Sequence, residues 1–114
     1  MEYALLFYVD HDKLGDPTGD ALAIEMAAVM REAEAAGAFK GAHRLCLPET
    51  ATTQCVRDGK VLTTDGPFSD TKECLAGLWV LECADLDEPL AWAERVPLAR
   101  FGQIEVRPTR PCPG

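Results

Sequence analysis

Residues 3–9, which read Tyr-Ala-Leu-Leu-Phe-Tyr-Val, form an apolar run with hydrophobic side chains at both odd and even positions. Because successive side chains of a strand point to opposite faces, this pattern predicts a strand covered on both sides. Residues 78–84, Leu-Trp-Val-Leu-Glu-Cys-Ala, predict a second strand of the same kind, interrupted only by Glu82. Such strands are typical of the middle of a sheet, so we expect these two segments to be central.

A helix and a further strand are expected between these two segments. Asp16-Pro17 or Thr18 is a suitable helix start, since proline is tolerated in a first turn. Gly37 is a suitable stop for the helix. A strand over residues 39–47 should follow and break at Pro48. The apolar residues at helical spacing are Leu22, Met26, Val29, Met30 and Ala33.

A β-hairpin is predicted in the middle of the chain. Residues 52–56 and 60–64 are prone to form strands and flank Arg57-Asp58-Gly59. Asp-Gly between such segments favours a tight turn, because both turn residues must accept a positive φ. Asp65-Gly66-Pro67 should end the hairpin, and residues 69–75 are expected to form a short helical turn capped by Ser69 or Asp70.

The last third of the chain predicts a helix and an edge strand. Leu86, Leu90, Ala93 and Val96 recur at helical spacing, with Pro89 in the first turn. Asp85 or Asp87 should cap this helix, and the position of Pro89 favours Asp87. Residues 103–107 alternate strictly, which predicts a strand with Ile104 and Val106 facing inward.

The element order is therefore β-α-β, a hairpin, then β-α-β, which predicts an α+β fold over residues 1–114 as a single domain. A ferredoxin-like split βαβ arrangement, with an antiparallel or mixed sheet, places the two doubly apolar strands side by side in its centre. Its helices cover only one face of the sheet. We expect a homodimer that stacks two sheets to bury the other face and to enclose a pocket, because a large exposed apolar face is unusual in a monomer.

Composition and charge limit the possible partners. The chain has 114 residues and a net charge of −8, which argues against binding a nucleic-acid backbone. The apolar run at residues 3–9 is too short to span a bilayer and lacks a basic leader, so we expect a cytoplasmic protein without a membrane partner. The chain has five cysteines without a C-x-x-C pair and two histidines. We therefore expect most of the cysteines to act as small hydrophobic residues in a reducing compartment rather than to form a metal site, and nothing indicates a cofactor.

One long segment carries a family resemblance. Residues 56–73, VRDGKVLTTDGPFSDTKE, resemble the signature of the DGPF branch of the YCII-related proteins. The match extends to residues 51–53, 81–88, 92–97 and 106–108. The resemblance implies a ferredoxin-like dimeric α/β barrel of uncertain biochemical role. Some DGPF proteins are similar to modules encoded beside, or fused to, extracytoplasmic-function sigma factors, and a YCII-type relative is a dehydrochlorinase credited with a His-Asp pair.

His43 and Asp65 are the pair in this chain that resembles such a dyad. An imidazole held by a carboxylate is suited to proton abstraction or elimination, so we consider them as candidate catalytic residues. The alternative is structural: His43 as a partly buried strand residue, and Asp65 as a turn former that bonds its own backbone before Gly66-Pro67.

Four further residues are candidate ligand-binding residues. Glu82 lies on an apolar strand, so its carboxylate should face a polar cleft, meet a cation, or lie near an exposed strand end. Lys72 and Arg57 are candidate partners for Glu82 or for an anionic ligand, unless they belong to a solvated face. Thr53 could offer a hydroxyl to a pocket, although threonine is equally normal in strands.

Three functions are therefore open. The first is small-molecule binding in a pocket between two stacked sheets. The second is a cofactor-free lyase or dehydrochlorinase that uses His43 and Asp65. The third is an interaction module for a sigma factor, which co-purification of that partner would support.

Overall fold

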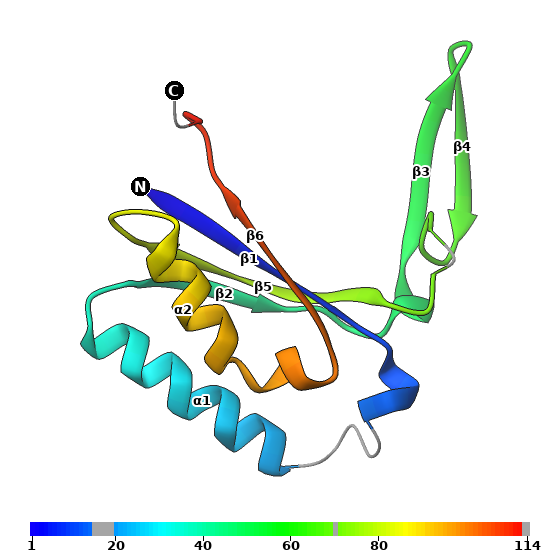
Figure 1. Ribbon diagram of the computed structural model, residues 1–114. Coiled ribbons are helices and arrows are strands. Elements are labelled where there is room, and N and C mark those ends of the chain that lie inside the picture. The colour runs from blue at the N-terminus through cyan, green and yellow to red at the C-terminus, as the bar shows by residue number, and fades with distance from the viewer. Residues whose placement is uncertain (15–19, 70, 113–114) are drawn as a thin grey trace.

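The computed structural model describes residues 1–14, 20–69 and 71–112, and it shows an α+β architecture with a separate hairpin (Figure 1). The helices are α1 (Asp20–Ala35) and α2 (Asp87–Arg95), and short 3-10 turns are η1 (His11–Leu14), η2 (Pro48–Thr50) and η3 (Pro97–Arg100). The strands are β1 (Glu2–Val9), β2 (Phe39–Arg44), β3 (Thr52–Arg57), β4 (Lys60–Asp65), β5 (Cys74–Glu82) and β6 (Gly102–Pro108).

The main sheet has the strand order β2-β5-β1-β6, and every pairing in it is antiparallel. The two doubly apolar segments, β1 and β5, are its central strands, as the sequence predicts. This order with these crossovers is that of a ferredoxin-like split βαβ sheet. Strands β3 and β4 form a second sheet of their own.

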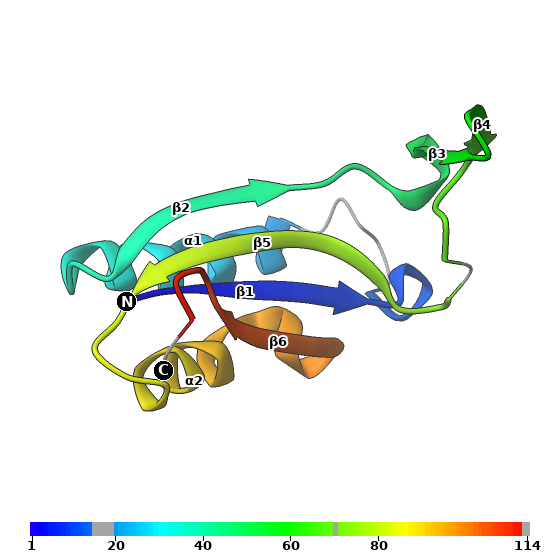
Figure 2. The same ribbon diagram turned by 90° about the horizontal axis from the view of Figure 1, so that it is seen from above.

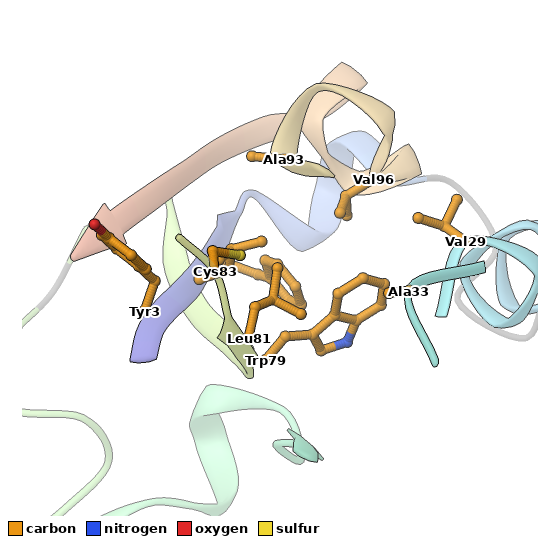
Figure 3. Close-up of a cluster of buried hydrophobic side chains, with 10 residues drawn as sticks. Tyr3, Val29, Ala33, Trp79, Leu81, Cys83, Ala93 and Val96 are labelled. Carbon is orange, nitrogen blue, oxygen red and sulfur yellow. The ribbon is translucent and has the colours of Figure 1, made fainter. Parts of the chain in front are cut away.

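Both helices lie on one side of the main sheet, and the hairpin projects toward the other side (Figure 1, Figure 2). The odd-numbered side chains of β1, among them Leu5 and Phe7, are buried beneath the helices together with Trp79 and Leu81 of β5. Figure 3 shows this cluster, which Val29 and Ala33 of α1 and Ala93 and Val96 from the α2 region complete. Ile104 and Val106 of β6 pack against the cluster, as predicted.

The helix α1 ends as the sequence predicts. Gly37 has a φ of +77°, and the Ala38 amide donates to the Ala33 carbonyl oxygen at 2.9 Å. This arrangement satisfies one of the last carbonyl groups of the helix and requires a residue that accepts a positive φ. The predicted start at residues 16–18 lies outside the described residues.

The hairpin turn is also as predicted. Asp58 and Gly59 both have positive φ values, 52° and 75°, which is the type I′ geometry that matches the twist of the flanking strands. The strands pair from Thr52 with Asp65 to Arg57 with Lys60.

Two predictions about the middle of the chain are wrong. The helical turn expected over residues 69–75 is absent from the described part of that segment, where bends lead into β5 at Cys74. Cys74 and Leu75 instead pair with Val9 and Tyr8, because the backbone ladder of the sheet outweighs the local turn preference. Strand β2 ends at Arg44 rather than at residue 47, since its last partner, Gly77, lies directly beside the irregularity in the β1–β5 pairing.

The cap of α2 also differs from the favoured assignment. The Asp85 carboxylate, not that of Asp87, accepts hydrogen bonds from the backbone amides of Asp87 at 3.1 Å and Glu88 at 3.4 Å. Asp87 is already inside the first turn, where its negative charge favours the helix N-terminus. Pro89 lies in this turn, as predicted, and is buried.

Candidate functional site

The uncovered face of the main sheet is apolar in its middle. It carries the even-numbered side chains Ala4, Leu6 and Tyr8 of β1, with Leu78 and Val80 of β5. These side chains are half-buried by their neighbours within the sheet, and neither α1 nor α2 lies over them (Figure 2). We call these five residues the open face.

Polar side chains border the open face on both edge strands. Across the sheet, His43 pairs with Leu78, Leu78 with Leu6, and Leu6 with Glu105, so His43 and Glu105 lie at opposite ends of one row. On β6, the Glu105 carboxylate forms a salt bridge with the Arg107 guanidinium. The open face therefore has an apolar centre and polar margins, as protein interfaces and ligand sites often do.

A groove of about 610 Å³ lies at one end of the open face and is open to solvent. It is lined by Tyr8, Thr71, Glu73, Gln103, Ile104 and Glu105. The Thr71 hydroxyl already donates to the Glu73 carbonyl oxygen at 2.9 Å, which fixes the segment that leads into β5. Two carboxylates, an amide, a phenol and a hydroxyl therefore surround a partly apolar floor.

The polar residues of this groove are not among the site residues that the sequence predicts. Gln103 and Glu105 occupy the outward positions of a strand whose alternation is visible in the sequence, so one signal is present. Tyr8 is on a central strand, and Glu73 precedes β5 in a segment for which a helical turn was expected. Two strand registers bring these segments together: one pairs Tyr8 with Gln103, and the other pairs Val9 with Cys74, next to Glu73.

His43 and Asp65 belong to different sheets. His43 is exposed on β2 and pairs with Leu78 of the open face. Asp65 is exposed at the end of β4, where it pairs with Thr52. Among the described contacts, no hydrogen bond or salt bridge joins them. Within one chain the pair is not assembled as a dyad.

Thr53 and Arg57 both lie on the hairpin. The Thr53 hydroxyl donates to the Gly66 carbonyl oxygen at 2.7 Å, so it closes the base of the hairpin. The Arg57 guanidinium donates to the Val56 carbonyl oxygen at 3.1 Å near the tip. Neither residue lines the groove.

Lys72 lies next to groove residues Thr71 and Glu73 and is exposed. Glu82 is at the exposed end of β5, where its carboxylate accepts a hydrogen bond from the Met1 ammonium at 2.8 Å. This hydrogen bond holds the pKa of Glu82 below its ordinary value. The cationic partner of Glu82 is thus the amino terminus rather than Lys72 or Arg57, and it ties β1 to the end of β5.

The cysteines are free thiols and differ in environment. Cys83 is buried, Cys55 and Cys74 are half-buried, and Cys46 and Cys112 are exposed. In residues 1–14, 20–69 and 71–112, no three His, Cys, Asp or Glu side chains gather as a metal site.

The Cys83 thiol should react slowly with alkylating agents. Burial, reinforced by the nearby Glu88 carboxylate, raises the pKa of Cys83 from 9.0 to about 11. Since the thiolate is the nucleophile, this shift lowers its population about 100-fold at pH 8. Iodoacetamide labelling followed by peptide mass mapping should therefore modify Cys46 and Cys112 at least 100 times faster than Cys83. Equal rates for Cys46 and Cys83 would contradict the burial of this thiol.

None of the helices in the described residues has the length and apolar character needed to cross a bilayer.

The chain is similar in sequence to known proteins over nearly its whole length. The sequence model of the YCII-related domain family matches residues 1–112 of this chain. An uncharacterised protein of Rhizobium meliloti (strain 1021) is 34% identical over 113 residues, covering 95% of this chain and 91% of that protein. The chain belongs to the YCII-related domain family.

Proposed function

We propose that this protein binds a small molecule in a pocket enclosed between the open faces of two copies of the chain. The observation that carries the proposal is the groove beside Tyr8, which lies at the margin of an apolar sheet face without a helix above it. Ligand sites usually bury most of the surface of their ligand. A groove this open cannot do so alone, and a second sheet stacked about 10 Å above the first supplies the missing wall.

The groove lining indicates the chemistry of the ligand. Glu73 and Glu105 offer carboxylate oxygens, and Gln103 offers an amide oxygen. A carboxylate accepts hydrogen bonds and donates none when ionised. The lining therefore favours a ligand that donates hydrogen bonds or carries a positive charge, such as an amine, with an apolar portion over the Tyr8 ring.

A fragment panel of primary amines, alcohols and carboxylates tests this function. Saturation-transfer NMR should detect amines bound to the protein, with affinity at least fivefold weaker in Glu105→Gln, since the variant removes the acceptor charge. Glu34→Gln, on the exposed side of α1, makes the same charge change away from the groove and should bind as the wild type does. Absence of amine binding, or equal binding by all three proteins, would contradict the proposal.

The elimination enzyme is a second hypothesis, supported by the position of His43 on the face that stacking would enclose. Its carboxylate partner would have to come from the hairpin of the second copy, because Asp65 of the same chain lies in another sheet. Turnover of a chlorinated substrate that survives in His43→Ala would exclude it.

A further inference from the structure

The hairpin of residues 52–65, which we call the arm, is separate from the body of the chain. Among the residues that the structure describes, each of its strands pairs only with the other, and every residue of β4 is exposed. Val56 and Val61 face each other across the strands and are 58% and 59% exposed, while Leu62, opposite Cys55, is 50% exposed. Because neighbouring residues of a strand point to opposite sides, both faces of the arm carry an apolar pair. A two-stranded hairpin is marginally stable in water by itself, so this arm needs a surface to pack against.

The arm projects from the same side of the sheet as the open face, at the end of the sheet away from both termini (Figure 1, Figure 2). The chain has an extent of 47 × 42 × 18 Å and a radius of gyration of 16.0 Å. A compact domain of this length would have a radius of gyration of about 13 Å. The main sheet and the arm thus meet at an angle. A molecule that packs on the open face therefore also contacts the arm.

We infer that the arm packs against a second copy of this chain and clasps it. The inference rests on the proposed function, which places that copy on the open face. Six residues per strand give the arm a length of about 20 Å, and stacked sheets are about 10 Å apart. The arm therefore crosses the space between the sheets and reaches the flank of the second copy. A two-fold axis makes the contact reciprocal, so each body is held by the arm of the other.

The area available supports this occupant. The open side of a four-stranded sheet of this length projects about 450 Å², whereas a stable interface buries about 800 Å² on each partner. One face of the arm adds about 200 Å², and the surface under the partner's arm adds a similar amount. With the clasp, the interface reaches the size that a stable dimer needs; without it, the interface is about half that size.

The charge of the arm also suits a second copy. Arg57 and Lys60 balance Asp58 and Asp65, so the arm has no net charge in a chain whose net charge is −8. Two such chains repel each other in general, and a segment without net charge approaches an acidic body without that penalty.

The test compares dimer dissociation constants from sedimentation equilibrium. The variant V56K/V61E removes an apolar pair from the arm and replaces it with opposite charges that attract across the strands, so the hairpin is retained and the net charge is unchanged. We expect its dissociation constant to rise at least tenfold. The control I24K/L86E makes the same change on exposed apolar residues of α1 and the start of α2, on the helical side, and should dissociate like the wild type.

Hydrogen exchange provides a second measurement. Amides of residues 52–65 should exchange more slowly in wild-type protein held well above its dissociation constant than in protein diluted well below it. Equal exchange at both concentrations, or equal dissociation constants for V56K/V61E and the control, would overturn the clasp while leaving the dimer in place. A wild-type chain that never dimerises would instead overturn the proposed function, and the clasp with it.

Discussion

Trp79→Ala should lower the free energy of unfolding by about 3–5 kcal/mol, the usual effect of removing a large buried aromatic side chain. Trp79 is 3% exposed and lies in the cluster between the sheet and the helices. Its ring packs edge-to-face against Phe7 at 5.5 Å and Phe39 at 5.9 Å between centroids, so the substitution removes both aromatic contacts and leaves a cavity.

Urea unfolding at a fixed protein concentration measures this loss, since association would otherwise change the apparent stability. Trp92→Ala is a matched control, because Trp92 is half-buried and has Arg95 over its ring at 5.1 Å rather than a second aromatic ring. Its effect should be clearly smaller. A loss below about 1 kcal/mol for Trp79→Ala would show that this residue is not central to the core.

The variant L6K/L78E should raise the dimer dissociation constant at least 100-fold. Leu6 and Leu78 are directly paired across the two central strands, in the middle of the open face. Opposite charges at these positions attract within one chain, so the sheet is retained, but stacking would bury both charges in an apolar interface. Sedimentation equilibrium measures the effect, and circular dichroism checks the fold. An unchanged dissociation constant would place the dimer interface elsewhere.

The sequence predicts the structure of a segment correctly where one local pattern determines the conformation of that segment. Hydrophobic residues on both faces of segments 3–9 and 78–84 predicted the central strands, and Asp58-Gly59 predicted the turn because few residues accept its backbone angles. The alternation in residues 103–107 identified which side chains of β6 face the core.

The remaining features depend on contacts between distant segments. Residues 69–75 have the composition of a helical turn, but pairing of Cys74 with Val9 draws their end into the sheet. The groove combines side chains from three separate segments of the chain, and the β1–β6 and β1–β5 registers bring these segments together. His43 and Asp65 were associated by their chemistry, and strand order, which no local pattern encodes, separates them into two sheets.

Coverage of the open face by a second copy requires that the chain dimerise. Sedimentation velocity of the wild-type chain at micromolar concentration should therefore show a single species with twice the 12.4 kDa mass of the chain. A folded species with the mass of one chain at that concentration would contradict it.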